Sequence, residues 1–482
     1  MNNILQSDSE NIESILQKVA SQGTDYLKNI NDRPTSSKFD SKEKLNLDEQ
    51  GLGTIQALEL FNQRFESTMV ASSGSRFWGY VTGGSTPASL VGDWLATIYD
   101  QNTQATNGNG DISANIELET INLLLELFEL PKEFLGGFVT GATMSNFTCL
   151  AVARQWIGKN YKDNQGNNSP KDIAKEGVRE EIAVLSATPH SSAIKAISLL
   201  GMGSTKIISV KTLEGNRETI SIPDLKKVIE SLNGKPFILL SSGGTVNTVD
   251  FDDFEAINKL KTKYNFWWHI DAAFGGFAAC SEKTKHLVKG WENADSITID
   301  CHKWLNVPYE SAIFLVKKEY SILQTEAFQN SNAPYLGNPF ENFSYLNVLP
   351  ENSRRLKALP AWFTLMAYGK EGYRDIVENC IDLANYFGQK ITDSNDLELL
   401  APIHLNNICF SLKKSNNEDN QDEVTLFLKK LNDTGKVFMT PTFYGSRKGI
   451  RASFVNWRTE KEDVDLVFEE MNQIILNFRI TF

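Results

Sequence analysis

The stretch 297-ITIDCHKWLNV-307 ends an apolar run with a His-Lys pair and then returns to apolar residues. The run 296-SITID-300 has the length and composition of a strand that is buried on both faces of a sheet. Lys303 would then lie at the end of that strand, where an ammonium group is costly to bury without a partner. A solvated loop is the commoner reason for a His-Lys pair, so the role of Lys303 depends on what else lies at the same edge.

Six further apolar runs, rich in Ile, Val and Phe, lie between residues 137 and 317. Amphipathic segments between most of them, such as 190-HSSAIKAISLL-200 and 251-FDDFEAINKLKTK-263, have the period of crossover helices. This alternation predicts an α/β fold, in which a mostly parallel sheet of seven strands has helices on both faces. The six runs are 137-GFVT-140, 182-IAVLS-186, 206-KIISV-210, 236-PFILLS-241, 266-FWWHID-271 and 312-AIFLV-316.

The N-terminal part of the chain has a different pattern. Residues 1–50 are polar and carry one weak helical pattern, formed by Ile12, Ile15, Leu16 and Val19. They predict an arm that packs on a partner subunit or a loose leader. Clearer helical patterns follow at 54–65, 87–99 and 115–130, and Pro131 ends the last of them.

The pattern changes again after residue 350. Two long helices, about 353–369 and 371–392, precede apolar runs at 405–412 and 449–455. Helical patterns at 422–433 and 460–477 complete what we predict as a small α+β domain. The connection 325–353, rich in Asn, Gly and Pro, is long and indicates a functional loop. We expect an N-terminal segment over 1–85, a large domain over 86–350 and a small C-terminal domain over 351–482.

Composition excludes several classes of function. The net charge of -12 and the pI of 5.1 argue against nucleic acid or an anionic membrane as a partner. The five cysteines form no CxxC pair and the five histidines form no HExxH motif, so we expect no disulfide framework and no metal site. The start MNNILQSDSE is unlike a signal peptide, and no run of about 18 apolar residues occurs. These features predict a cytoplasmic protein that acts on a small molecule.

Ligands of open α/β sheets bind at the carboxyl ends of the strands. After the strand 137-GFVT-140, Gly141 permits a tight turn, and Ala142 and Thr143 begin a helix whose free N–H groups suit a phosphate. A plain strand–helix turn with Thr143 as N-cap is the alternative. The stretch contains no GxGxxG, which disfavours a dinucleotide site.

Three further side chains are predicted at the same edge. His190 starts a helix after the strand at 182–186, where a capping role is common. Asp271 ends the very apolar 266-FWWHI-270 and precedes 272-AAFGG-276, whose small residues leave room for a flat object; an N-cap or turn role is the alternative. Lys303 is of the residue type that forms Schiff bases. Together with the phosphate turn, these parts suit a planar, phosphorylated pyridine aldehyde.

The order of these motifs resembles the group II pyridoxal-5'-phosphate (PLP) decarboxylases, which include aromatic-L-amino-acid, glutamate and 2,4-diaminobutyrate decarboxylases. The matching motifs are 137-GFVTGATMSN-146, 190-HSS-192, 269-HIDAAFGG-276 and 300-DCHKWL-305. The resemblance runs from about Arg76 to the C-terminus. It implies the aspartate-aminotransferase fold (fold type I), a homodimer, and decarboxylation of an L-amino acid, with an aromatic one slightly favoured.

The resemblance also implies roles for cofactor-binding residues. Lys303 matches the Schiff-base lysine, Asp271 the partner of the pyridine nitrogen, and Ala273 and His190 the residues on the two faces of the ring. The phosphate turn matches Ala142 and Thr143, and His302 lies near the phosphate in relatives. Two positions depart from the family. Asp300 stands where many relatives have Asn, and Val246 replaces the second Thr of a G-T-T motif, which leaves Thr245.

Other site residues concern the substrate. Tyr345 has the spacing before Arg354 of a catalytic tyrosine that protonates the substrate carbon in aromatic-acid relatives; a packing role is the alternative. Arg451 matches an arginine that positions the substrate carboxylate in some relatives, although a structural ion pair is equally consistent with its position. The stretch 76-RFWGYVTGGSTPASL-90 matches a substrate-lining segment through Trp78, Tyr80 and Thr82, which could also be core residues.

Two other functions compete with decarboxylation. The same fold supports oxidative deamination to an aldehyde, which relatives with Phe in place of the catalytic Tyr favour, and carbon–carbon lyase reactions. A non-catalytic scaffold that retains the fold is the alternative from a different class. The presence of Lys303, Asp271 and His190 argues against a scaffold.

Overall fold

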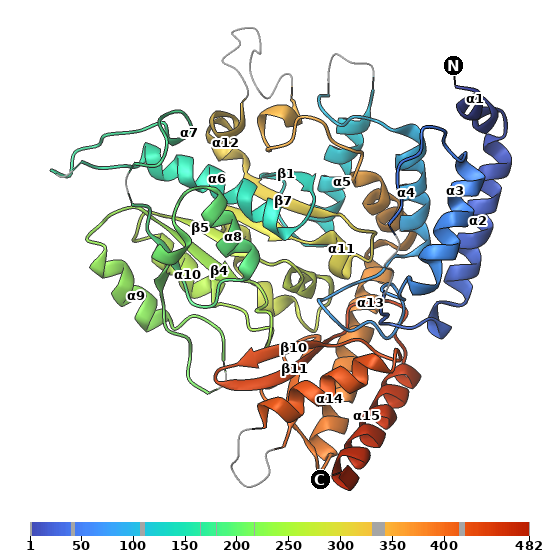
Figure 1. The fold of residues 1–482 in the computed structure, drawn as a ribbon. Coiled ribbons are helices and arrows are strands. Elements are labelled where there is room, and N and C mark those ends of the chain that lie inside the picture. The colour runs from blue at the N-terminus through green and yellow to red at the C-terminus, as the bar shows by residue number, and fades with distance from the viewer. Residues whose placement is uncertain are drawn as a thin grey trace.

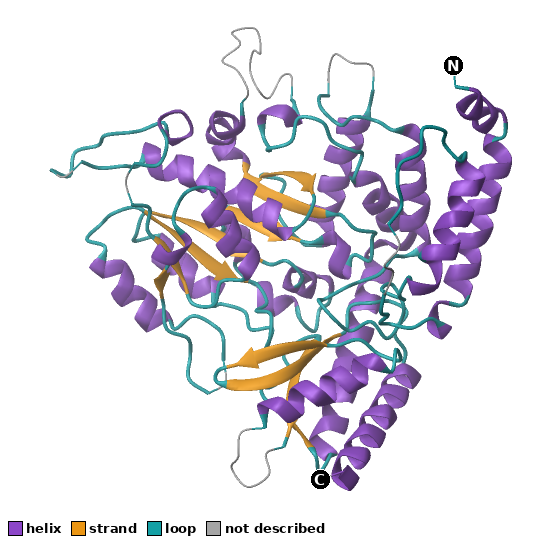
Figure 2. Ribbon diagram, in the orientation of Figure 1, coloured by secondary structure: helices purple, strands orange, loops and turns teal. Residues whose placement is uncertain are grey.

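The computed structural model describes residues 2–39, 44–106, 111–163, 165–179, 181–215, 217–329, 343–413 and 420–481. A large sheet lies in the middle of the molecule, with the N-terminal helices along one side (Figure 1). A smaller sheet and the C-terminal helices lie together at one end, which Figure 2 shows as the lower group of orange strands and purple helices.

The central sheet has seven strands in the order β1-β7-β6-β5-β4-β2-β3. Five neighbouring strands from β3 to β6 run parallel, whereas β7 is antiparallel to both β6 and β1. The predicted mostly parallel sheet of seven strands is therefore confirmed. The strands are β1 (Phe134–Val139), β2 (Val184–Ser186), β3 (Ile208–Ser209), β4 (Phe237–Ser242), β5 (Phe266–Asp271), β6 (Ser296–Ile299) and β7 (Ala312–Lys317).

Helices cover both faces of this sheet, which explains why its strands are almost continuously apolar. In β5, Trp267 packs against Trp156 on one face, with ring centroids 6.3 Å apart. Its neighbour Trp268 points to the other face and lies 5.9 Å from Phe254. The helices of this region are α5 (Ser113–Leu127), α6 (Ala142–Lys159), α7 (Ile173–Glu176), α8 (Ser191–Leu199), α9 (Ile222–Ser231), α10 (Phe254–Lys261), α11 (Cys301–Trp304) and α12 (Ser321–Phe328).

The smaller sheet is antiparallel, with four strands in the order β10-β11-β9-β8. The predicted α+β character is confirmed, but the sequence patterns missed β8, which has three residues, and β10, an edge strand that contains Pro441. The elements are β8 (Leu397–Leu399), β9 (Asn407–Leu412), α14 (Gln421–Asp433), β10 (Thr440–Tyr444), β11 (Arg447–Ser453) and α15 (Lys461–Thr481). The domain boundaries at residues 85 and 350 stay predictions.

One long helical segment, α13 (Ala358–Asp393), joins the two sheets and packs along α4. Gly369 interrupts it with φ 58° and ψ −167°, a backbone conformation that favours glycine. The two helices that the sequence predicted here are therefore the two arms of a kinked segment. The N-terminal helices beside it are α1 (Asn3–Glu10), α2 (Ile12–Lys28), α3 (Thr54–Arg64) and α4 (Pro87–Tyr99).

The described residues contain neither a membrane-spanning helix nor a cluster of metal ligands. None of their helices combines the length and apolar character needed to cross a membrane. Among the same residues, no three His, Cys, Asp or Glu side chains gather in a way that would hold a metal ion.

A buried ion pair fixes the end of the long connection that precedes α13. The Arg354 guanidinium contacts both carboxylate oxygens of Glu117 in α5, at 2.9 and 3.2 Å. It also donates to the carbonyl of Phe138 in β1, whose N–H donates to Glu117. The two charged side chains are only 2% and 0% exposed, so each depends on the other for its solvation.

We expect Arg354→Met to lower the free energy of unfolding by about 3–5 kcal/mol, because it leaves the Glu117 carboxylate buried without its cation. Denaturant unfolding followed by circular dichroism measures this loss. The control is Arg355→Met, which removes the more exposed pair with Asp93 and should cost less than about 1 kcal/mol. Equal losses for the two variants would show that burial of the Arg354 pair does not matter.

Candidate active site

A cavity of about 590 Å³ lies where the carboxyl ends of β2, β4, β5 and β6 face strand β11 of the smaller sheet. Seven of the predicted site residues line it, among them His190, Asp271, Ala273 and Lys303. The structure thus brings together side chains that are more than 110 positions apart in the sequence. Its other lining residues include Tyr80, Thr245, Val246, Asn247, Phe274, Glu218 and Arg451.

Lys303 lies in α11, directly after β6, and its ammonium contacts the Asp300 carboxylate at 2.8 Å. The segment before α4 packs on the Lys303 backbone so closely that a Cβ at Gly83 would fall 1.5 Å from the Lys303 carbonyl oxygen. The Phe274 ring lies 5.7 Å from the ammonium on another side. Lys303 is therefore held in a narrow, largely dry position with its amine at the cavity.

Asp271 accepts a hydrogen bond of 3.0 Å from the Asn146 amide nitrogen, and a long one of 3.3 Å from the N–H of Ala273. The Asn146 amide oxygen accepts from His269 Nε2 at 2.8 Å, and His269 Nδ1 lies 2.8 Å from the Ser296 hydroxyl. This chain of neutral groups orients the carboxylate. Among the described residues, no cation lies within ion-pairing distance of it, so Asp271 has room for a positively charged partner in the cavity.

Burial keeps His269 neutral within this chain. Its side chain has no exposure, and desolvation lowers its pKa to about 4, although the Asp271 carboxylate opposes the shift. Because Asn146 presents its oxygen to Nε2, that nitrogen carries the proton of the neutral ring, and Nδ1 accepts from Ser296. The network thus donates in one direction, from Ser296 towards Asp271.

His190 is the N-cap of α8, which confirms its predicted place at a helix start. Its Nδ1 accepts from the N–H of Ser192 at 3.2 Å, which leaves the proton of the neutral ring on Nε2. The surrounding protein lowers the pKa of His190 by desolvation, and the Asp271 carboxylate opposes this shift. A neutral, flat imidazole therefore lines the cavity together with Asp271.

A candidate phosphate cradle is formed by the first turn of α6 and His302. The helix begins at Ala142 with Gly141 as its N-cap, so Thr143 is a first-turn residue and not the cap. A Cβ at Gly141 would lie 3.5 Å from the His302 ring. His302 Nδ1 accepts from the N–H of Ser311 at 3.2 Å, and desolvation lowers its pKa, so the ring is neutral with an Nε2–H to donate. Free helix N–H groups and this donor suit a phosphate.

The Asp300 carboxylate lies close to this cradle, and its negative charge does not suit a phosphate. Its carboxylate is 2% exposed, and Oδ1 has no hydrogen-bond partner. Oδ2 contacts the Lys303 ammonium at 2.8 Å and lies 3.8 Å from His302 Nε2. The Lys303 ammonium therefore neutralises the negative charge that the sequence analysis identified as a departure from the family.

The remaining predicted cofactor-binding residues are Thr245 and Ala273. Thr245 lines the cavity, and its hydroxyl accepts from the N–H of Asp250, which closes a turn. Ala273 lines the cavity, as expected of a small residue beside a flat ligand. The neighbouring Gly275 serves packing instead, since a Cβ there would fall 1.9 Å from the Gly243 carbonyl oxygen.

The predicted substrate residues divide into three groups. Tyr80 and Arg451 line the cavity, and Tyr80 has a left-handed backbone with φ 56°. Thr82 is buried, and its hydroxyl lies 3.3 Å from that of Tyr309, whose ring lies tilted against the His302 ring with the centroids 4.5 Å apart. Trp78 is a core residue and not a substrate-lining one: it is 1% exposed, and its indole N–H donates to the Ser75 carbonyl.

Tyr345 is also a packing residue in this structure, so its predicted role as proton donor does not fit. Its side chain has no exposure, and its hydroxyl donates to the Gly136 carbonyl at 3.2 Å. The ring lies 4.3 Å from the Arg354 guanidinium and 4.8 Å from the Phe343 ring, away from the Lys303 cavity. The packing alternative for this tyrosine is the one that the structure favours.

Three residues of the region had no role in the sequence analysis. Asn146 belongs to the motif 137-GFVTGATMSN-146, so a signal was present, but its function depends on a contact across the sheet edge. Glu218 comes from an irregular segment whose pattern gave no signal. Tyr309 follows the His-Lys pair, and its ring packs at a tilt against the His302 ring, a contact that local spacing does not reveal.

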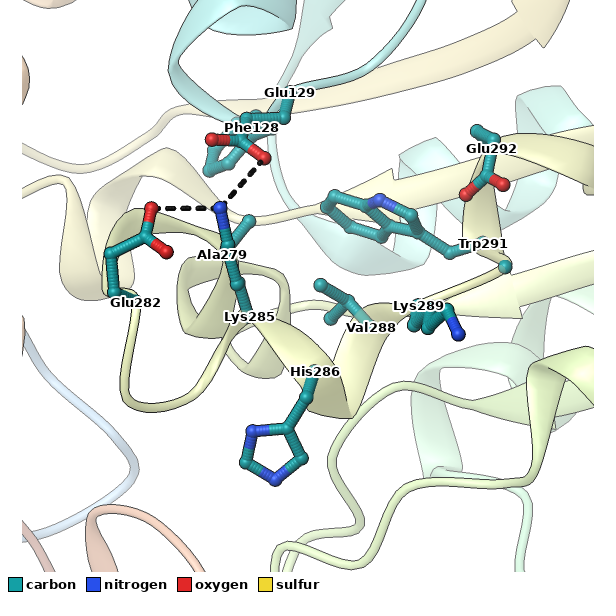
Figure 3. Close-up of a pocket in the computed structure, with 11 residues that line it drawn as sticks. Phe128, Glu129, Ala279, Glu282, Lys285, His286, Val288, Lys289, Trp291 and Glu292 are labelled. Atoms are coloured by element: carbon teal, nitrogen blue, oxygen red, sulfur yellow. Dashed lines mark hydrogen bonds and ion pairs between the residues drawn. The ribbon is translucent and has the colours of Figure 1, made fainter.

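A second cavity, of about 390 Å³, lies beside Trp291 and differs in its charges. Figure 3 shows Lys285 between Glu282 and Glu129, at 2.7 and 3.7 Å. Lys289, on the same wall, is paired with Glu255 at 2.9 Å. The two lysines that line this cavity are thus already paired with carboxylates.

The residues around Lys303 fit PLP. The Lys303 amine suits the aldehyde of PLP, and the Asp271 carboxylate suits its cationic ring nitrogen. Ala273 and His190 line the cavity with a small and a flat side chain, which suit its ring. The first turn of α6 and His302 supply donors for a phosphate. Each of these groups thus matches one chemical group of the cofactor, whereas the Asp300 carboxylate does not.

Comparison with known sequences points the same way. Residues 54–413 match the pyridoxal-dependent decarboxylase conserved domain. The chain is 26% identical over 480 residues to an aromatic-L-amino-acid decarboxylase of Bacillus atrophaeus, a match that covers 96% of this chain and 95% of the other. It is also 26% identical over 411 residues to a phenylacetaldehyde synthase of a Rosa hybrid cultivar, covering 80% and 78% of the two chains.

Solved structures share the fold. The structure of Oryza sativa TDC with PLP and tryptamine superposes with a TM-score of 0.86 at 18% identity, covering 97% of this chain and 98% of that one. Mouse CSAD in its apo form gives a TM-score of 0.84 at 21% identity, covering 96% and 98%. The predicted fold class is therefore confirmed.

The buried His269 predicts a pH dependence of stability. The unfolded chain binds a proton on this residue near pH 6.5, whereas the folded chain does so only near pH 4, so stability falls as the pH drops through this window. His269→Gln keeps a donor for Asn146 but does not titrate. We expect the stability difference between wild type and this variant to shrink by about 2 kcal/mol from about pH 8 to about pH 5. Denaturant unfolding at each pH measures it, and a constant difference would contradict a neutral His269.

Proposed function

Because the chain belongs to the family of pyridoxal-dependent decarboxylases, we propose that it releases the α-carboxylate of an L-amino acid as CO2 and leaves the amine. The observation that carries this proposal is the meeting of Lys303, Asp271 and His190 in one cavity. An aromatic L-amino acid is the first substrate to test, since curated relatives include aromatic-L-amino-acid, tyrosine and tryptophan decarboxylases. PLP is the proposed cofactor.

The chain's own residues would divide the work as follows. Lys303 Nζ would hold the cofactor at its aldehyde group, the position that the substrate's amino group also needs. Asp271 would hold a proton at the ring nitrogen, and Asn146 keeps the Asp271 carboxylate in place. His190 and Ala273 would flank the ring. When bound, PLP supplies an electron-poor ring that accepts the electron pair left by CO2.

Arg451 is the proposed partner of the substrate α-carboxylate. Its guanidinium lines the Lys303 cavity, and its Nη1 makes one hydrogen bond of 3.4 Å, to the Val246 carbonyl. Desolvation lowers its pKa, so the guanidinium is a partly dried cation to which a carboxylate would bind well. Holding that carboxylate fixes the Cα–carboxylate bond relative to the ring, which selects the bond that breaks.

We also propose a homodimer, on the evidence of exposed apolar side chains on the N-terminal helices. On α4, Val91, Trp94 and Ile98 are 50%, 47% and 60% exposed. Ile12 and Leu16 of α2 are likewise exposed. An apolar row of this kind is typical of a surface that a partner subunit covers.

The test of function is a screen of the common L-amino acids with PLP present, in which both CO2 and the organic product are measured. We expect CO2 and an amine in equal amounts from at least one amino acid. Lys303→Ala should lower that rate by about a hundredfold or more, because it removes the amine that carries the cofactor. Aldehyde with ammonia in place of amine would support oxidative deamination, and a full rate without Lys303 would refute the proposed site.

A proton donor for Cα remains to be assigned, since Tyr345 is buried. The segment 325–353 has one other tyrosine, Tyr335, which lies outside the described residues. We propose Tyr335 as the donor. Tyr335→Phe should slow amine formation by about a hundredfold, because the proton is no longer delivered to Cα, and should raise the share of aldehyde in air, because dissolved O2 can then oxidise the unprotonated carbon. Tyr345→Phe is the matched control and should leave the product ratio unchanged; the opposite pattern would assign the role to Tyr345.

A further inference from the structure

Glu218 is an acidic side chain on the wall of the Lys303 cavity with no part in the proposed chemistry. It lies in the irregular segment between β3 and α9, beside Thr188 of the loop that carries His190. Asp271 belongs to the cofactor's ring nitrogen in the proposed function, and Asp300 is paired with Lys303. Glu218 is therefore the carboxylate of this cavity that is left to meet the substrate.

The carboxylate of Glu218 is held firmly, and only by neutral donors. Oε1 accepts from the Asn247 amide at 2.9 Å, and Oε2 accepts from the Thr248 hydroxyl at 3.1 Å and its N–H at 3.4 Å. The backbone is fixed as well, since its N–H donates to Asp250 and its carbonyl accepts from Thr188. Within the described ranges, no Lys, Arg or His nitrogen comes within 4.0 Å of the Glu218 carboxylate, so its charge is not compensated by an ion pair.

Arg451 lies on the same wall of the cavity and, like Glu218, has no ion-pair partner among the described residues. Its Nε is buried without a hydrogen-bond partner, and its Nη1 makes a single long bond to a carbonyl. In the part of the chain that the structure describes, no carboxylate pairs with it. Glu218 acts on it electrostatically but stays beyond ion-pairing distance. Two opposite charges thus face one cavity separately, an arrangement that is costly unless a ligand pairs with each.

Resting on the proposed decarboxylation, we infer that Glu218 selects the side chain of the substrate. The α-amino group of a bound amino acid takes the place of the Lys303 amine, and its α-carboxylate pairs with Arg451. The side chain is the remaining part that can reach Glu218. The substrate class is then L-amino acids whose side chain ends in a hydrogen-bond donor, such as an ammonium, phenol or indole N–H. Amino acids with a side-chain carboxylate or sulfinate are excluded by repulsion.

The test compares substrates in pairs that differ at the end of the side chain: L-tyrosine with L-phenylalanine, L-2,4-diaminobutyrate with L-norvaline, and L-glutamine with L-glutamate. Some pairs will not be substrates at all. For each pair that does react, the wild-type enzyme with PLP should release CO2 faster from the first member than from the second. Glu218→Gln should lower kcat/KM for the donor substrates about tenfold or more, because a neutral amide replaces the charged acceptor. It should leave the substrates without a donor almost unchanged.

Two further variants separate selection from structure. Glu214→Gln removes an exposed acid from the same segment and should change no preference. Glu218→Asp keeps the charge and should retain the preference in part. The absorbance of bound PLP should be the same for Glu218→Gln as for wild type, because Glu218 has no part in holding the cofactor. The amide oxygen can accept from Asn247 or from Thr248 but not from both, so thermal unfolding of this variant measures the structural cost separately.

An equal loss for all substrates in Glu218→Gln would overturn the inference, as would a wild-type preference for glutamate. These results would leave decarboxylation itself intact. If the wild type released CO2 from no amino acid, the proposed function would fail, and this inference would fail with it. A tenfold selective loss confined to the donor substrates would establish Glu218 as the residue that reads the side chain.

Discussion

The site depends on the hydrogen bond between Asn146 and Asp271. A carboxylate at the end of a buried strand is stable only if its charge is solvated by the protein. Here neutral groups supply that solvation, through Asn146 and then His269 and Ser296. No described cation pairs with Asp271, so its carboxylate lines the cavity without an ion-pair partner. A cationic ligand bound there would supply one.

The rest of the fold brings a second reactive group, the Lys303 amine, to the cavity that the Asp271 carboxylate lines. Parallel strands deliver their carboxyl ends to a single edge, so residues that follow β2, β5 and β6 meet although they are far apart in sequence. The β5 and β6 registers put Asp271 beside Thr298, two residues before Asp300. The short helix α11 then turns Lys303 into the same space, and Gly83 allows a neighbouring segment to close over its backbone. The acid and the amine are therefore positioned by the sheet and not by flexible loops.

Much of this arrangement could be predicted from the sequence, since it follows from local patterns. Continuous apolar runs identified the seven strands, and the residues directly after them identified Asp271, His190 and Lys303. Contacts that depend on packing could not be predicted. Trp78 and Tyr345 have spacing that matches a substrate or catalytic residue, but each is buried with its polar group satisfied by a backbone carbonyl. Spacing does not show whether an aromatic side chain faces a cavity or the core.

Glu218 is a site residue that the sequence patterns could not identify. It lies in an irregular segment, and its importance comes from what is missing around it, namely a cation within reach. A sequence shows which residues are charged but not which charges remain unpaired after folding. The unpaired charges of Asp271, Arg451 and Glu218 are properties of the folded chain, and together they account for a cofactor, a substrate carboxylate and a substrate side chain.

The most direct test of this account is to locate the covalent bond between protein and cofactor. Borohydride reduction of the PLP-loaded protein, followed by trypsin digestion and mass spectrometry, makes that bond permanent and identifies the residue. We expect the mass of reduced PLP on Lys303 within the peptide 290–317, because the modified lysine blocks cleavage at that position. A label on any other lysine, or no label, would contradict it.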